Sequence, residues 1–362
     1  MSIYIHIPFC NTICSYCDFC KIIYEKKYIK KYLEALEKEI KTNYNNEIVD
    51  TIYIGGGTPS SLSIEELQKL FEIIKIFKTN KNIEFTFECN IESLDEEKIK
   101  LLSGSNVNRI SIGIESFNKN NLKFLKRNSN YKEIKNKIKL LKKYGINNIN
   151  VDLIYAIPNE TLKVLKKDLK LINRLKIKHV STYSLIIENN TYLKINNVKN
   201  IDQDLDFKMY NYICKYLKKH GFIHYEISNF SKKGYESKHN LTYWNNEKYY
   251  GFGLGASGYI KNVRYTNTRS FSKYINSNYV LEEEEMTKQI EKENELILGL
   301  RKLEGINKDK FLSKYNEKIE EKEIIKKLLK EGMLKENRNN IYINPKYIYT
   351  SNDILINIIG EV

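Results

Sequence analysis

Three cysteines near the start of the chain have a spacing that suits an iron–sulfur cluster. Cys10, Cys14 and Cys17 form a C-x3-C-x2-C pattern after a run of alternating β-formers, Ser2 to Ile7. This pattern predicts a short strand that ends in a loop carrying three thiolates. Zinc and iron–sulfur clusters both bind thiolates, but structural zinc usually takes four ligands, whereas three cysteines leave one iron of a [4Fe–4S] cube open. Cys20 leaves a fourth ligand possible.

Further residues with chemical potential stand at or near the ends of predicted strands. The segment Gly55-Gly-Gly-Thr-Pro59 follows a strand over 51–54, and Glu88 follows a strand over 83–87. Glycines allow a backbone to come close to a ligand, and a carboxylate can accept hydrogen bonds from hydroxyl or ammonium donors. The simpler interpretation of Gly55 to Pro59 is a tight turn, which the glycine triplet makes less favourable.

Six predicted strands alternate with helices along the first half of the chain. The strands cover 2–7, 51–54, 83–87, 109–117, 148–154 and 179–187, with helices over 28–42, 63–77, 95–102 and 162–174 and two helical stretches before Tyr144. This alternation is typical of βα units joined by right-handed crossovers, and in βα barrels the active site lies at the carboxyl ends of the strands. Six units are too few for a closed eight-stranded barrel. The sequence therefore predicts an α/β fold, a partial (β/α)6 barrel over residues 1–200.

The pattern changes in the second half of the chain. An extension over 201–281 contains a helix at 202–220, a strand at 224–230 and a glycine-rich run at 251–258. That run does not lead into an amphipathic helix, so it indicates a close backbone approach rather than a dinucleotide site. Residues 282–285 are expected to form an acidic linker. Over 286–362, helical stretches at 287–303, 308–315 and 320–331 and a hairpin at 333–343 predict a small winged-helix-like domain without a base-reading signature.

Composition narrows the class of protein. The chain has 362 residues, of which 41% are hydrophobic and 29% charged, as in a globular protein. No apolar run approaches the roughly 20 residues of a membrane span, and the first residues lack a signal pattern, so we expect a cytoplasmic protein. Clustered cysteines there are metal ligands more often than disulfides. The net charge is +15, and the lysines are spread over many predicted helix faces rather than gathered in one block. This distribution favours compositional drift over a dedicated site for a polyanion. Peripheral contact with an anionic membrane surface is a further expectation.

Several segments together resemble a known superfamily. The motifs YIHIPFC…CSYCDF, IGGGTPSSL, NRISIGIESF, NVDLIYAIP and HYEISNF…HNLTYW resemble radical S-adenosylmethionine proteins. More narrowly they resemble the oxygen-independent coproporphyrinogen III oxidase-like family, and within it haem chaperones of the HemW type. The resemblance runs from Tyr4 to Gly258 and is weaker beyond. It implies that Cys10, Cys14 and Cys17 hold a [4Fe–4S] cluster whose fourth iron binds S-adenosylmethionine.

The resemblance also implies which residues contact S-adenosylmethionine. These are Tyr4, Gly56, Gly57, Thr58, Glu88, Glu115, Arg127 and Asp152. The chain departs from the family at Glu115, where glutamine is usual, so the loss of an amide donor puts that contact in doubt. A surface salt bridge is the alternative interpretation of Arg127 and of Asp152.

A second informative motif is His239-Asn-Leu-Thr-Tyr243-Trp244, which holds the only tryptophan. Neutral imidazole is a good axial ligand for haem iron, and aromatic rings suit a porphyrin face. The motif resembles the H-N-x-x-Y-W motif of HemW-type proteins, which implies haem binding by His239. The alternative is a hydrogen-bonded histidine beside a core aromatic residue.

Three functions are considered, two from this resemblance and a third from the basic surface and the carboxyl-terminal domain. The first is a haem chaperone that carries haem as cargo and passes it to acceptor proteins such as respiratory enzymes. The second is a coproporphyrinogen III oxidase, and the third is a radical protein that modifies nucleic acid. Two features favour the chaperone: the cysteine motif begins without the amino-terminal extension of the oxidases, and Cys17-Asp18-Phe19 stands where they have Cys-Gly-Cys.

Overall fold

The computed structural model describes residues 1–359 and has a partial parallel barrel at its centre. Its six strands lie side by side in chain order and are all parallel: β1 (Ser2–Ile7), β4 (Val49–Gly56), β5 (Thr79–Cys89), β6 (Arg109–Glu115), β7 (Asn148–Tyr155) and β8 (His179–Ser184). The predicted partial (β/α)6 barrel is confirmed.

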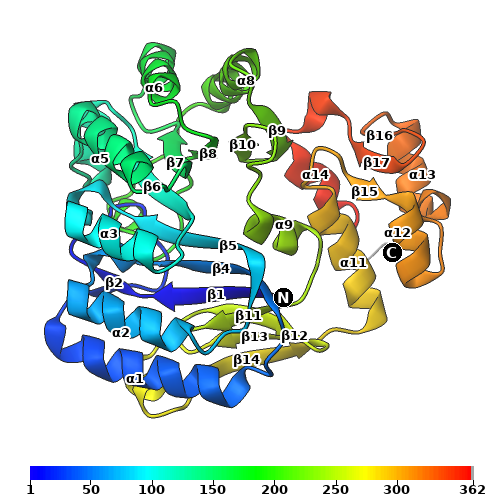
Figure 1. The fold of residues 1–362 in the computed structure, drawn as a ribbon. Helices are drawn as coiled ribbons and strands as arrows, with labels where there is room; N and C mark the ends of the chain where they lie inside the picture. The colour runs from blue at the N-terminus through cyan, green and yellow to red at the C-terminus, as the bar shows by residue number, and fades with distance from the viewer. Residues whose placement is uncertain (360–362) are drawn as a thin grey trace.

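Helices cover the outer face of these strands (Figure 1). They are α1 (Lys26–Asn43), α2 (Ile64–Ile74), α3 (Glu96–Gly104), α5 (Tyr131–Lys143), α6 (Leu162–Arg174) and α8 (Gln203–Lys219). The short helix α4 (Lys119–Leu125) instead lies against the cysteine loop, where Ser15 N donates to the carbonyl oxygen of Leu125 at 3.2 Å. The helix start signals act as expected: Ser63 and Glu66 form the capping box that begins α2. Because side chains alternate along a strand, Ile3, Ile5 and Ile7 of β1 are fully buried beneath the helices, while polar neighbours face the barrel interior.

Short strands extend the sheet at both edges. Beyond β8 lie β10 (Asn229–Ser231) and β9 (Ile223–Glu226), so the strand predicted at 224–230 is a tight antiparallel pair. Beyond β1 lie β11 (Tyr249–Phe252), β12 (Ser257–Ile260), β13 (Val263–Asn267) and β14 (Val280–Glu285). Of these, β11 is parallel to β1 and the rest are antiparallel.

The prediction of an acidic linker at 282–285 is wrong, because these residues belong to β14. Arg264 of β13 faces Glu284 across the pair, an arrangement of opposite charges that stabilises a ladder. All six side chains of β14 are exposed, so the strand lacks the alternation that would have revealed it. A row of glutamates on an outermost strand also discourages pairing with another chain.

The glycine-rich run packs against the chain itself. Gly253 has a φ of +104°, and a Cβ there would lie 2.5 Å from the carbonyl oxygen of His6. The buried carboxylate of Glu39 fixes this region, since it accepts hydrogen bonds from Gly253 N (2.9 Å), Asn267 Nδ2 (2.6 Å) and the Tyr274 hydroxyl (2.5 Å). Burial raises the pKa of Glu39 to about 7. The predicted close backbone approach is therefore made to β1.

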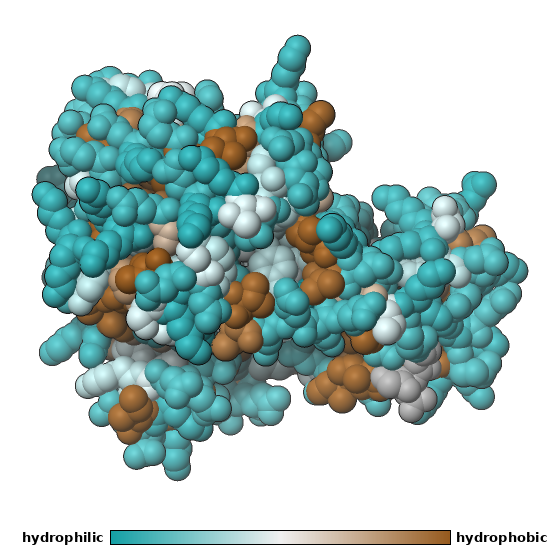
Figure 2. All heavy atoms as spheres, turned by 90° about the horizontal axis from the view of Figure 1, so that it is seen from below, coloured by the Kyte–Doolittle hydropathy of each residue, from teal (hydrophilic) through white to brown (hydrophobic). Residues whose placement is uncertain are grey.

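The carboxyl-terminal elements form a small lobe beside the barrel (Figure 1), and this lobe projects from the main body in Figure 2. It contains α11 (Lys288–Gly299), α12 (Lys308–Tyr315), α13 (Glu323–Lys330), α14 (Ser351–Ile356) and a sheet of β15 (Ile306–Asn307), β17 (Asn340–Ile343) and β16 (Leu334–Glu336). The predicted helices and hairpin are present, with β15 as an additional strand. On the face in Figure 2, apolar residues form small separate groups. Within residues 1–359, no helix has the length and apolar character to cross a membrane.

Candidate functional site

The cysteine loop lies over the carboxyl ends of the parallel strands. It is closed at its base by β2 (Phe9–Cys10) and β3 (Ile22–Ile23). Cys10, Cys14 and Cys17 all line one cavity of about 400 Å³. Burial raises the pKa of each thiol, that of Cys17 to about 11, which favours the protonated form. Binding of a metal would displace the thiol protons.

The donor set fits an iron–sulfur cluster. In the part of the chain that the structure describes, no three His, Cys, Asp or Glu side chains converge closely enough to hold a single metal ion. A cluster, by contrast, binds each cysteine at a different iron, so its ligands need not converge on one point. Arg127 Nη1 lies 4.0 Å from Cys14 Sγ, and the Thr58 hydroxyl lies 3.6 Å from Cys10 Sγ. These donors suit sulfur atoms that become negatively charged.

Cys20 is placed apart from the other three cysteines. It does not line the cavity, and its side chain lies where a Cβ on Gly255 would meet it at 2.7 Å. Its carbonyl oxygen accepts a hydrogen bond from His6 Nε2 at 2.7 Å. This position favours three ligands from the loop over four.

The glycine turn and Glu88 form one wall of the cavity. Gly56 has a φ of +116°, and a Cβ there would lie 2.6 Å from the His6 ring. Its backbone N–H donates to Glu88 Oε2 at 3.1 Å, and the Tyr53 hydroxyl donates to Oε1 at 2.6 Å. Burial raises the pKa of Glu88 to about 7. Gly57 and Thr58 complete this wall.

Glu115 and Arg127 stand together beside the cysteine loop. Glu115 ends β6 with a φ of +62°, which is unusual for a residue with a side chain. Burial raises its pKa to about 7, although the positive charge of Arg127 opposes this. Arg127 is almost fully buried and donates from Nη2 to the carbonyl oxygen of Gly113 at 2.7 Å. Arg127 also forms an ion pair with the partly exposed Glu92, at 3.9 Å, so the salt bridge considered for Arg127 is present but is made from a buried position beside the cavity.

Asp152 and Tyr4 complete the set of expected residues. Asp152 is a half-buried cavity residue whose carboxylate accepts from Ser111 Oγ (3.2 Å) and Asn150 Nδ2 (2.9 Å), and desolvation raises its pKa. Tyr4 lies behind the wall residue Tyr53, with ring centroids 6.1 Å apart. Its hydroxyl is 2.9 Å from His6 Nδ1. Seven of the eight expected residues thus line the cavity, and Tyr4 supports the wall.

Several cavity residues were not predicted from the sequence. They are Tyr53, Arg109, Ser111, Asn150, Ser181 and Tyr183. The sequence does carry a signal for them. Each lies two residues, or a multiple of two, from another inward-facing residue of the same parallel strand, and residues at this spacing share one face of the sheet. Polar side chains at such positions of a buried strand indicate an interior cavity.

His239 lies on a short helix, α9 (Lys238–Trp244), near the amino ends of the strands (Figure 1). The side chain is 1% exposed, and both ring nitrogens are engaged: Nδ1 with Thr51 Oγ1 and Nε2 with the Tyr243 hydroxyl, each at 2.8 Å. The ring stacks on Tyr53 with centroids 5.1 Å apart. Burial lowers the pKa of His239 to about 3, so the imidazole is neutral. His239 therefore lies behind Tyr53, which lines the cavity, and does not itself line it.

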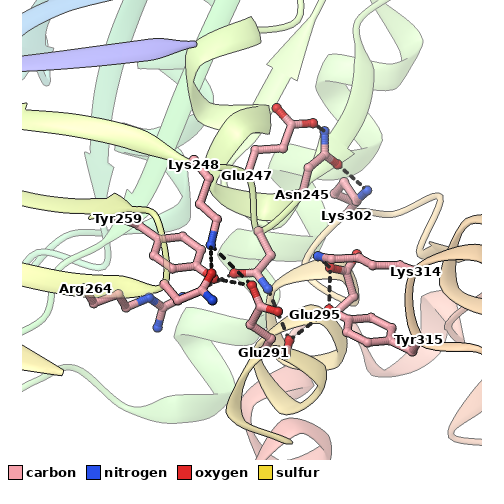
Figure 3. A network of polar contacts seen from close by, with 12 residues as sticks. Asn245, Glu247, Lys248, Tyr259, Arg264, Glu291, Glu295, Lys302, Lys314 and Tyr315 are labelled. Carbon is pink, nitrogen blue, oxygen red and sulfur yellow. Dashed lines mark hydrogen bonds and ion pairs between the residues drawn. The ribbon is translucent and has the colours of Figure 1, made fainter. Parts of the chain in front are cut away.

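The segment after α9 is tied to the carboxyl-terminal lobe by a polar network (Figure 3). Lys302 donates to Asn245 Oδ1 at 2.6 Å. Glu291 of α11 accepts from Lys248 Nζ (3.3 Å) and from the Tyr259 hydroxyl (2.5 Å). The lobe thus helps to fix the position of α9.

A partial parallel barrel with a three-cysteine loop at the carboxyl ends of its strands defines a radical S-adenosylmethionine protein. The sequence model of the Radical SAM superfamily matches residues 4–172. The solved structure titled "Coproporphyrinogen III oxidase (HemN) from Escherichia coli is a Radical SAM enzyme" superposes with a TM-score of 0.87. It covers 100% of this chain and 90% of that one at 18% identity, a likeness that concerns the fold alone.

Sequence relatives define the family more narrowly. The Heme chaperone HemW of Lactococcus lactis is 39% identical over 98% of this chain and 96% of its own length. That of Bacillus subtilis is 36% identical over the full length of both chains, and that of Escherichia coli is 32% identical over 77% of both. The chain belongs to the HemW family of heme chaperones.

Proposed function

We propose that this chain binds a [4Fe–4S] cluster through Cys10, Cys14 and Cys17, and S-adenosylmethionine in the adjoining cavity. The observation that carries this proposal is the single cavity of about 400 Å³ lined by all three thiols and by seven of the eight expected cofactor residues. This volume lies in the range of small-molecule sites.

The residues of the chain would divide the work of binding. When bound, a cluster with one open iron supplies an electron and a coordination position for the amino and carboxylate groups of S-adenosylmethionine. Glu88, already held by Gly56 N and the Tyr53 hydroxyl, offers its free lone pairs to hydroxyl or ammonium donors. Arg127 would offset the negative charge of the thiolates, and α9 would keep water from the interior.

We infer further that the cargo is haem, which the chain passes to haem-acceptor proteins such as respiratory enzymes. The relatives in the family are named heme chaperones, and His239 stands in an H-N-x-x-Y-W motif. Its neutral imidazole is the form that binds iron. Since Thr51 and Tyr243 engage both nitrogens, binding requires α9 to shift and one of these hydrogen bonds to be exchanged for iron. We place this transfer in the cytoplasm, where the net charge of +15 also permits contact with an anionic membrane surface.

The test uses one anaerobically reconstituted preparation of each variant. Haem titration of the wild-type chain should give a saturable Soret shift that His239→Ala loses. His220→Ala is the matched control, because this histidine stacks on Tyr216 of α8, away from the cavity, and should leave the shift unchanged. Equal shifts in all three proteins would refute the role of His239.

The same preparation tests the second function. The fold of the Escherichia coli oxidase keeps a coproporphyrinogen III oxidase as the alternative. Formation of protoporphyrinogen IX from coproporphyrinogen III, at a rate comparable to that of the oxidase assayed beside it, would replace the chaperone proposal. A salt-sensitive shift of RNA or DNA in a gel would favour a nucleic-acid function instead.

A further inference from the structure

Arg109 is a buried cation in the barrel interior that lacks a negatively charged partner. It begins β6, is 2% exposed, and lines the same cavity as the cysteines. Its guanidinium makes one long hydrogen bond, from Nη1 to Thr86 Oγ1 at 3.4 Å, while Nε is buried with no partner. Within residues 1–359 it forms no ion pair.

Five carboxylates line the cavity, and the two whose charges interact with Arg109, those of Glu88 and Asp152, are held by other groups. Glu88 accepts from the Tyr53 hydroxyl and from Gly56 N. Asp152 accepts from a serine hydroxyl and an asparagine amide on β6 and β7. Neither carboxylate therefore lies at hydrogen-bond distance from the Arg109 guanidinium. The N–H groups of Arg109 remain available to bind another group.

A buried charge without a partner destabilises the folded state, so a position of this kind needs a reason outside the fold. Arginine presents a planar fork of donors that matches the two oxygens of a carboxylate. We propose that Arg109 binds the carboxylate of a ligand that enters the barrel cavity. Ser181 and Tyr183, which line the same cavity, add polar groups around that carboxylate.

This inference deepens the proposed function and rests on it only for the identity of the ligand. Haem carries two propionate carboxylates, which are the chemical group that the guanidinium would bind. A small free carboxylate has the same chemistry. The experiment therefore uses three probes: haem, haem dimethyl ester in which both carboxylates are masked, and succinate.

Binding to the reconstituted full chain is measured by Soret titration for the two haems. One charge-assisted pair changes affinity by about tenfold to a hundredfold. We expect wild type to bind haem more tightly than the ester by this factor, and Arg109→Met to bind both equally. Arg109→Lys, which keeps the charge without the fork, should give an intermediate ratio. The matched control Arg174→Met, on the outer helix α6, should keep the wild-type ratio.

Thermal unfolding gives a second measurement that does not depend on haem. Removing an unpaired buried charge should leave the melting temperature of Arg109→Met unchanged or raise it. Succinate at millimolar concentration should raise the melting temperature of wild type and of Arg174→Met more than that of Arg109→Met.

The outcomes separate this inference from the proposed function. Failure of both haems to bind, with the succinate effect retained, would overturn the haem proposal and support the carboxylate site. Equal affinity of wild type for haem and its ester, together with equal succinate shifts in all variants, would overturn the role of Arg109. A fall of roughly 10 °C or more in the melting temperature of Arg109→Met would overturn it too, since the guanidinium would then be structural.

Discussion

The carboxylate of Glu84 holds the beginning of the helix that carries His239. It accepts hydrogen bonds from the backbone N–H groups of Lys238 (3.1 Å) and His239 (3.0 Å). Glu84→Gln keeps the shape of the side chain but removes its charge and replaces one acceptor oxygen with an NH2 group. One backbone donor then faces another donor. A hydrogen bond to a charged group contributes about 1.5–3 kcal/mol, so we expect local opening of α9 to become easier by that amount.

This free energy corresponds to a change of roughly 10- to 150-fold in the opening equilibrium. Hydrogen exchange of the amides in residues 238–244 should accelerate by this factor, while exchange in the central strands changes only as far as global stability does. Because His239 must leave Thr51 or Tyr243 to meet iron, haem association should accelerate as well. Glu34→Gln, on the exposed face of α1, is the control and should alter neither rate.

Two results would contradict this reasoning. Unchanged exchange in 238–244 would mean that the contacts to Glu84 do not hold α9. An acceleration spread equally over all strands would mean that α9 opens only when the whole protein unfolds, so that haem could not reach His239 by a local movement.

Three further predictions concern the cysteine loop, the glycine turn and pH. Cys17→Ser should lose most of the bound iron after anaerobic reconstitution, whereas Cys20→Ser should keep it, because only Cys17 lines the cavity. Gly57→Ala should lower both iron content and melting temperature, since its Cβ would lie 2.7 Å from the backbone of Pro8, which cannot move independently of β1. Glu39 has a folded-state pKa of about 7, above its ordinary value of 4.5. Its contribution to stability is therefore fully present below pH 4.5 and is lost as pH rises through 7, by up to about 3 kcal/mol. Glu39→Gln should lose less stability than wild type between pH 5 and pH 8 in urea unfolding, and the slope that stays belongs to other buried acids such as Glu88 and Glu115.

Each of these predictions has its own refutation. Equal iron content in Cys17→Ser and Cys20→Ser would mean that Cys20 also acts as a cluster ligand. Gly104→Ala is the control for the glycine turn, because a Cβ there meets nothing within 4 Å, and an equal loss in both alanine variants would contradict the packing argument. A pH slope in Glu39→Gln as steep as that of wild type would assign the slope to other buried acids.

The barrel could be predicted from the sequence because its signals are local. Hydrophobic periodicity and the capping box at Ser63 act within a few residues, so the six βα units were predicted correctly, and the first helix was predicted to begin two residues after its start at Lys26. The cysteine loop follows from the same kind of short-range pattern, since its spacing and the strand before it lie within twenty residues.

The surroundings of His239 could not be predicted, because its partners are distant in the chain. Thr51 and Glu84 lie far from α9 in sequence, and a helix of seven residues has little periodicity to reveal it. Nothing in the motif itself indicates that both ring nitrogens are engaged. The strand β14 was missed for a related reason, since an edge strand exposed on both faces carries no alternation.

The pairing of β1 with β11 has a consequence for the order of events during synthesis. Ser2 pairs with Tyr249 and Ile5 with Phe252, so one flank of the first strand is supplied by residues made late. Contacts between such distant residues form slowly, because the chain between them must first be ordered. At ribosomal rates the delay before residue 252 is made is on the order of tens of seconds. The cysteine loop directly follows β1, so it is held in its final position only after about two-thirds of the chain has been made. Stable binding of iron must therefore follow synthesis of the barrel.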